Sequence, residues 1–281
     1  MPTGKKPSLL ENVFLLYIPL TAFLSFVIFP FFWTIVTSFK VESDIVKIPV
    51  KYLPNPATFH NYVVAWKNVG FSIFFKNSVV ISSISVVFIV MCSVLVGYAL
   101  SRFDFKGKQA FMIVLLCTQF IPGAMMIIPL FITFKNIGLI NNMFSLVIVN
   151  ATFLLPFNSI LMRGFISSIP IQLEEAAMID GCGRLKAIQS IILPILMPGI
   201  VATSAFAFVG CWNEFLFAFM FINKKSLFTL PVGLKYMIGE YTINYGALAA
   251  GSIIALIPAV LIFAYMQKFL IGGLSAGGVK G

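Results

Sequence analysis

The sequence predicts an all-α membrane protein with six transmembrane helices. Of its 281 residues, 60% are hydrophobic and only 10% are charged, whereas a soluble domain carries about a quarter charged residues. The mean hydropathy is +1.02, and a soluble fold has too little polar surface to cover that much apolar material. The apolar residues also gather in runs of about 20, the length that crosses a bilayer as a helix. A transmembrane β-barrel is excluded because its strands would alternate in units of about ten residues.

Six apolar segments meet this length requirement, and together they predict a single transmembrane domain covering residues 1–281. Their approximate bounds are 13–39, 77–100, 109–134, 144–161, 200–222 and 247–269. The first follows Lys5 and Lys6 but is far longer than the signal-peptide core of about 7–15 residues, so we expect an uncleaved span. The second is the clearest, since no charge lies between Lys76 and Arg102. Prolines inside the other runs are tolerated because neighbouring helices satisfy the freed carbonyls.

The remaining segments are expected to lie outside the membrane. Residues 40–76 contain Pro49, Pro54 and Pro56 and predict an irregular loop. The glycine-rich tail, residues 272–281, is expected to be extended or flexible. An even number of spans places both termini on one side, but the basic residues then divide almost evenly between the two sides. The positive-inside rule therefore gives no orientation.

The sequence offers little for catalysis or metal binding. His60 is the single histidine, and the four cysteines form no C-x-x-C pair, so zinc sites and histidine-based triads lack their residues. No G-x-x-x-x-G-K-[ST] run occurs, so we expect no ATP hydrolysis, and no cofactor or metal, in this chain.

A short helix is predicted between the fourth and fifth spans, at about residues 170–180. Pro170 suits a first helical turn, Glu174 and Glu175 favour its N-terminal end, and Gly181 suits the position just past its end. Leu173, Ala176 and Ala177 fall at i, i+3 and i+4 and are expected to form one stripe. This stripe either docks into a partner's groove or rests on the membrane surface.

Here the sequence resembles a known family. Glu175-Ala176-Ala177, Gly181, Ile191 and Leu193-Pro194 have the spacing of the EAA motif of bacterial ABC-importer permeases. The resemblance implies a type I ABC-importer transmembrane domain in which this loop is a cytoplasmic coupling helix that docks on the ATP-binding subunit. It implies an ATPase-coupling role for Glu174, Glu175, Ala176, Ala177, Asp180, Gly181, Leu193 and Pro194. It also implies that both termini are cytoplasmic, in a bacterial inner membrane.

Further stretches are similar to the carbohydrate-importer branch, specifically its smaller, MalG-type permease. They are Trp33–Lys40, Gly97–Gly107, Ile128–Phe131, Trp212–Phe217, Thr229–Gly233 and the tail Gly273–Gly281. The resemblance implies four kinds of partner: a second homologous permease, a dimer of ATP-binding subunits that hold ATP and magnesium, an extracellular solute-binding protein, and a sugar or oligosaccharide. The chain is then a transport subunit, not an enzyme. The alternatives are an ABC permease for another solute, and a channel or secondary transporter.

One intramembrane carboxyl group stands out in the fifth predicted span. Glu214 follows Trp212 and Asn213, and an intramembrane acid usually faces a cavity or a partner. An aromatic face with amide and carboxylate oxygens suits a sugar path, to which Asn150 of the fourth span is added. The alternative for Glu214 is a structural hydrogen bond to another helix or to the second permease.

Overall fold

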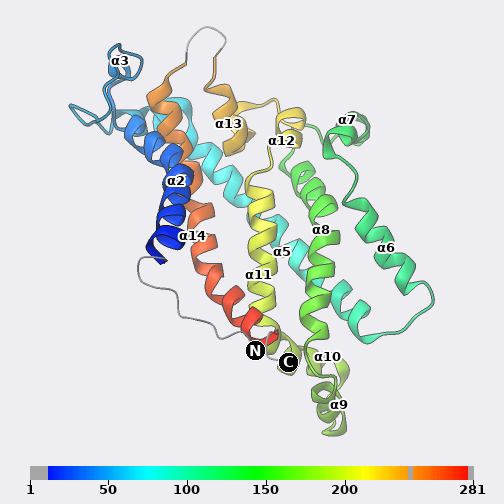
Figure 1. The fold of residues 1–281 in the computed structure, drawn as a ribbon. Helices are drawn as coiled ribbons and strands as arrows, with labels where there is room; N and C mark the ends of the chain where they lie inside the picture. Colours follow the sequence, from blue (N-terminus) through cyan, green and yellow to red (C-terminus); the bar gives the residue numbers. More distant parts are fainter. Residues whose placement is uncertain (1–11, 240–242, 278–281) are drawn as a thin grey trace. The chain divides into compact units, whose positions relative to one another are not determined.

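The computed structural model describes residues 12–239 and 243–277, and most of these residues are helical (Figure 1). Lys5, Lys6 and Lys280 lie outside the described residues. The chain divides into two compact units, Met1–Gly70 with Tyr236–Ile254, and Phe71–Lys235 with Ala255–Gly281. The predicted single domain stays a prediction, and the two units are described separately.

The first unit contains one long apolar helix and a folded loop. Its elements are η1 (Val13–Tyr17), α2 (Ile18–Ser38), α3 (Glu42–Ile45), α4 (His60–Val63), η2 (Val64–Val69) and the start of α14 (Tyr245–Gly277). The loop after α2 is anchored by Asn61, whose amide donates to the carbonyls of Ser38 (2.9 Å) and Lys40 (2.7 Å). The proline-rich loop is therefore irregular, as expected, but it is tied to the end of α2.

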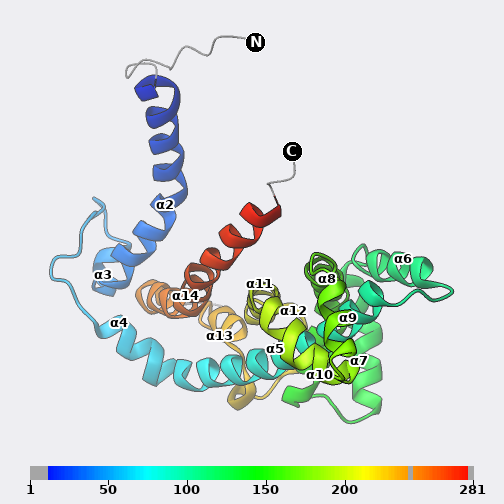
Figure 2. The same cartoon turned by 90° about the horizontal axis from the view of Figure 1, so that it is seen from below.

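The second unit holds the core. Its elements are α5 (Phe71–Arg102), α6 (Lys108–Thr118), η3 (Gly123–Met126), α7 (Ile127–Asn136), α8 (Met143–Ser167), α9 (Gln172–Ile179), α10 (Arg184–Ala187), η4 (Ile188–Ile192), α11 (Leu193–Trp212), α12 (Leu216–Phe221), η5 (Lys225–Leu227), α13 (Leu230–Tyr236) and the rest of α14. Helix α8 lies between α6 and α11, as Figures 1 and 2 both show, and α5 packs along it.

Small residues let α5 and α8 approach closely. A Cβ added at Gly97 of α5 would lie 2.9 Å from the backbone nitrogen of Arg163 in α8. Below this point Tyr98, Met162, Ile166 and Leu196 form a buried apolar cluster that joins α5, α8 and α11. Close packing through small residues is the usual way in which helices associate in a membrane. The three helices thus form the scaffold that carries α9.

By length and composition, five helices of the described residues are able to span a membrane, and a bent pair brings the number up to six. The bent pair covers the predicted third span, 109–134, which is broken within its length. Lys108–Thr118 and Gly123–Asn136 meet at 90°. Pro122 lies at the break with an extended backbone (ψ 125°), because it has no N–H for the helical ladder and Gly123 follows it.

The fifth span is also placed differently from the prediction of 200–222. The helix runs over Arg184–Trp212, with η4 forming a π-helical turn directly before Leu193 and Pro194. Pro194 therefore lies in the first turn of α11 but inside the longer helical run Arg184–Trp212. The π turn directly before it is where the hydrogen bonding departs from the α pattern. After Trp212 the chain leaves the helix for Asn213–Phe215 and then forms α12.

The tail differs as well. Helix α14 continues to Gly277, so the extended conformation expected from residue 272 onward is wrong up to that point. Leu274, Ser275 and Ala276 separate the glycines and no proline intervenes, so nothing removes a ladder hydrogen bond. Residues 278–281 lie outside the described residues.

Candidate coupling site

Helix α9 forms where the short helix was predicted, beginning two residues later. Glu174 and Glu175 lie in its first turn, where carboxylates interact favourably with the helix dipole. Its end is fixed by Gly181, which has φ +84°. The N–H of Gly181 donates to the carbonyl of Met178 (3.1 Å) and that of Cys182 to Ala177 (3.0 Å). These two bonds are a Schellman cap, and they explain why glycine occupies this position.

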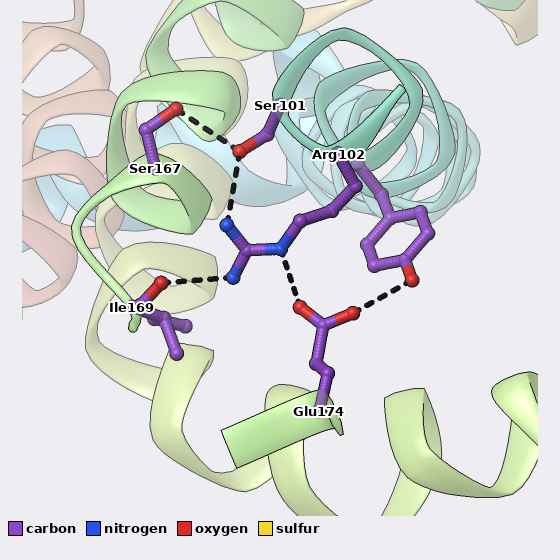
Figure 3. Close-up of polar contacts among 6 residues, drawn as sticks. Ser101, Arg102, Ser167, Ile169 and Glu174 are labelled. Carbon is purple, nitrogen blue, oxygen red and sulfur yellow. Dashed lines mark hydrogen bonds and ion pairs between the residues drawn. The ribbon is translucent and has the colours of Figure 1, made fainter. Parts of the chain in front are cut away.

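Glu174 points inward from α9 and is 5% exposed. Its carboxylate accepts a hydrogen bond from the Tyr98 hydroxyl (2.8 Å) and forms an ion pair with the Arg102 guanidinium. Both partners come from the last two turns of α5 (Figure 3). The ion pair is buried, with 8% of the Arg102 side chain and 6% of the Glu174 side chain exposed. One face of α9 is therefore attached directly to a membrane-spanning helix.

Arg102 also reaches the end of α8. Its guanidinium donates to the carbonyl of Ile169 (2.9 Å), and Ser101 and Ser167 share a hydrogen bond of 3.0 Å (Figure 3). The guanidinium thus connects α5 both to Glu174 of α9 and to the segment directly after α8. We call Tyr98, Arg102 and Glu174 the anchor network.

A second contact holds the segment that follows α9. The Arg184 guanidinium lies 5.0 Å from the centroid of the Phe103 ring, and this ring packs edge-on against Tyr98 (6.0 Å between centroids). Cation–π contacts of this kind occur within about 6 Å. The loop after α5 therefore touches both the anchor network and the start of α10.

The outer face of α9 differs from the predicted stripe. Leu173 and Ala176 are exposed as expected, but Ala177 is 5% exposed and faces inward beside Glu174. The reason is that i, i+3 spacing aligns Ala177 with the buried Glu174. Apolar side chains on the outer surface are instead Leu173 (42% exposed), Ile179 (86%) and Leu185 (77%). Glu175 and Asp180 are exposed at the same surface.

The sequence reasoning missed Tyr98, Arg102, Phe103 and Arg184 as parts of this site. Arg102 ends a span that is otherwise uncharged, and Glu174 lies in an acid-rich helix. These two isolated residues of opposite charge were the sequence signal from which the ion pair could have been predicted. Leu193, from the motif, packs against the apolar cluster around Tyr98 and Met162, whereas Pro194 is exposed.

The predicted path residues do not form one open site. Trp212 is 3% exposed, and its indole N–H donates to the carbonyl of Ala255 (2.9 Å). Phe208 stacks on its ring at 5.3 Å and Phe75 meets it edge-on at 5.7 Å. Trp212 therefore has packing partners and a satisfied donor within its own chain.

Glu214 has a structural contact of its own. Its carboxylate oxygens accept from the backbone N–H groups of Phe217 (2.7 Å) and Ala218 (3.0 Å), so it caps the first turn of α12. This is the structural alternative, made within the chain instead of to another subunit. Asn213 is exposed and Asn150 is 4% exposed on α8. A sugar-path role for these four residues stays a prediction.

No group of three or more histidine, cysteine, aspartate or glutamate side chains able to hold a metal ion occurs within residues 12–239 and 243–277.

Comparison with known proteins gives one consistent result. Residues 89–275 match the family described as binding-protein-dependent transport system inner membrane component. The diacetylchitobiose uptake system permease protein DasC of Streptomyces coelicolor is 32% identical over 254 residues, which are 90% of this chain and 92% of that protein. The trehalose/maltose transport system permease protein MalG of Thermococcus litoralis is 34% identical over 90% of this chain and 92% of its own.

The fold also matches a solved structure. A crystal structure of a bacterial ABC transporter involved in the import of the acidic polysaccharide alginate contains a chain that superposes with a TM-score of 0.82 at 21% identity. The match covers 94% of this chain and 99% of that chain.

Proposed function

Because the chain belongs to the family of binding-protein-dependent transport system inner membrane components, we propose that it forms half of the translocation path of a sugar importer and couples that path to ATP hydrolysis in a partner subunit. Membership makes it a multi-pass membrane transport component and not an enzyme. It also overturns the alternative of a channel or secondary transporter.

The geometry of α9 is the observation that carries the coupling role. One face of the helix is fixed to α5 by the buried ion pair between Arg102 and Glu174. Leu173 and Ile179 of α9 and Leu185 of α10 are exposed apolar side chains beside this attachment. Docking of a short helix in a groove uses apolar anchors of this kind. A partner that moves this surface moves α5 with it, because the connection is an ion pair with hydrogen bonds and not a flexible loop.

The partner at this surface is the ATP-binding subunit dimer, which holds ATP and magnesium. In this proposal the described residues of the permease contribute no nucleotide ligand, and Glu174, Glu175, Ala176, Ala177, Asp180, Gly181, Leu193 and Pro194 act by shaping and holding the coupling helix. The loop between α8 and α11 is then cytoplasmic, and so are both termini, in the bacterial inner membrane.

Two further partners complete the importer. A second homologous permease supplies the other half of the path. An extracellular solute-binding protein, which the family description implies, docks on the loops 40–76 and 223–246. The substrate is a sugar or oligosaccharide, since DasC and MalG are permeases for diacetylchitobiose and for trehalose and maltose. Asn213 and Asn150 stay the candidates for contact with it.

Co-purification tests the coupling surface. The Ile179→Asp substitution places a charge at a side chain that is 86% exposed, so folding is unaffected while docking is lost. We expect the variant to insert normally but to recover the ATP-binding subunit poorly. Ile137→Asp is the matched control, since Ile137 is 60% exposed at the end of α7, at the other end of the second unit from α9 (Figure 1). Equal recovery of the ATP-binding subunit by both variants would overturn the assignment.

A further inference from the structure

The first unit contains a cavity of about 320 Å³ where α2, the loop after it and the start of α14 meet. Its lining includes Trp33, Thr37, Lys40 and Tyr245, residues that together carry an ammonium group, two aromatic rings and two hydroxyl groups. Cavities of about 300 Å³ and more hold small ligands. The coupling role of the second unit makes no use of this cavity.

Lys40 is the unusual member of the lining because it is 2% exposed. Its ammonium donates to the carbonyl of Lys51 and lies 4.5 Å from the centroid of the Trp33 ring. A buried charge is costly unless an opposite charge neutralises it. Lys40 was expected among the basic residues of an exposed loop, and its burial removes it from any docking surface there.

The two acids closest in the chain are engaged elsewhere. Glu42 accepts from the backbone N–H groups of Tyr245 and Gly246, each at 2.8 Å, and so caps α14. Asp44 forms an ion pair with Lys51 (2.7 Å), and the Lys51 ammonium beside it holds the pKa of that carboxyl below its ordinary value. No carboxylate among residues 12–239 and 243–277 forms an ion pair with Lys40. Asp44 is also near enough to Lys40 for the Lys40 charge to contribute to lowering its pKa, but Asp44 makes its ion pair with Lys51. The positive charge at the cavity is therefore only partly compensated in this part of the chain.

The surroundings of the cavity favour a lipid over a saccharide. Helix α2 is apolar on all sides, and none of its span is buried within the described residues; Phe23, Phe26 and Phe29 are each more than 60% exposed. Lys40 follows the end of this helix by two residues. The Trp33 ring already carries the ammonium of Lys40 and stacks with Phe29 at 6.2 Å, so it offers little free face to a sugar ring.

We propose that this cavity binds the phosphate group of an anionic phospholipid, with Lys40 as the counter-charge and the hydroxyl groups of Thr37 and Tyr245 as donors. Basic pockets between membrane helices bind lipid headgroups in this way, and hydrogen bonds to a charged group are stronger than neutral ones. The acyl chains then lie along the exposed apolar side of α2. The bound lipid holds the loop after α2 against the start of α14.

Native mass spectrometry of the full chain, purified with its partner subunits, tests the proposal with phosphatidylglycerol and phosphatidylcholine as probes. We expect retained phosphatidylglycerol and little phosphatidylcholine in the wild type, and about a tenfold weaker retention for Lys40→Met, as a lost charged hydrogen bond implies. Lys40→Arg is expected to keep the binding. Lys47→Met is the matched control, since Lys47 is an exposed lysine of the same loop.

A second variant and two soluble probes make the experiment decisive. If Lys40→Met does not assemble, Thr37→Val, which keeps the lysine, is expected to weaken phosphatidylglycerol retention by several-fold in a complex of unchanged thermal stability. Glycerol 3-phosphate and glucuronate serve as soluble probes. Lys40-dependent binding of either soluble probe without lipid retention, or equal retention of the two lipids, would overturn the proposal.

Discussion

The buried ion pair between Arg102 and Glu174 illustrates how single residues contribute to the stability of this protein. Two buried charges stabilise a structure only if each has its partner, because removing one leaves the other unpaired at a cost of about 3–5 kcal/mol. Tyr98 and the Ile169 carbonyl satisfy further positions of the same groups. The network is therefore sensitive to loss of one member and tolerant of loss of both charges.

We expect Arg102→Met and Glu174→Leu to lower the stability of the protein by about 3–5 kcal/mol each, and the double substitution to recover most of this loss. Thermal unfolding in detergent measures it. The control is the ion pair between Lys108 and Asp104, at 3.0 Å with Asp104 fully exposed; Asp104→Asn should have no measurable effect. Additive losses in the Arg102/Glu174 double variant would contradict the coupling between the two residues.

Gly181 gives a second prediction for a single residue. Its φ of +84° lies in the left-handed region, and no atom lies within 4 Å of an added Cβ, so the cost of a side chain comes from the backbone alone. Gly181→Ala should destabilise the cap of α9 by about 1–2 kcal/mol. Gly183→Ala is the control, since Gly183 has the same open space without a positive φ. Amide exchange of α9 measures the difference, and equal protection in the two variants would contradict the role of the left-handed conformation.

Among the elements, the close approach of α5 and α8 positions the coupling site. The two helices approach closely at Gly97, one residue before Tyr98 of the anchor network. Since the nearest atoms are backbone atoms of Arg163 and Met162, they are unable to move aside as a flexible side chain would.

We expect Gly97→Ala to destabilise the helix pair by about 1–3 kcal/mol through overpacking, although alanine favours a helix over glycine by about 1 kcal/mol. Gly164→Ala on α8 has open space and should be neutral or stabilising. The thermal midpoints of the two variants in detergent test this. A midpoint for Gly97→Ala at or above that of the wild type would show that the helices do not approach as described.

The short helix α12 gives a prediction that separates two roles of Glu214. If Glu214 acts as a cap, Glu214→Ala should lower the stability of the protein by about 0.5–2 kcal/mol. Glu214→Gln should lower it less, because the amide oxygen still accepts a hydrogen bond. As a substrate contact, Glu214→Gln should instead raise the KM for sugar at unchanged stability. Uptake kinetics and thermal unfolding of both variants, measured together, distinguish the cap from the contact, and we expect the cap.

The sequence predicts the position of whole helices better than it predicts single side-chain contacts. Hydropathy located most of the apolar helices but misplaced the fifth by more than two turns, whereas Pro170 and Gly181 located α9 within two residues. The 90° break at Pro122 and the end of the fifth helix at Trp212 were not predicted, because an apolar run looks the same whether its helix is straight or interrupted. The anchor network was not predicted either, since 72 residues separate Arg102 from Glu174 and only the fold brings them together.

In the proposed function, a membrane scaffold is joined to a surface that a partner subunit moves. Helices α5, α8 and α11 form the scaffold, the anchor network fixes α9 to it, and Leu173, Ile179 and Leu185 face outward. A transport cycle needs two states whose balance the ATP-binding subunits shift, and a partner shifts that balance only through contacts that differ between the states. In the proposed function, the attachment of α9 to α5 is the physical link through which this happens.

The most direct test of this claim is the number of ATP molecules hydrolysed per sugar transported by the complex in proteoliposomes, measured for the Arg102→Met/Glu174→Leu double variant. The substitution keeps the stability of the protein but removes the charged attachment of α9. The account predicts that ATP hydrolysis continues while sugar uptake falls, so that the ratio rises several-fold over the wild type. Wild-type uptake at an unchanged ratio, in a fully assembled complex, would contradict it.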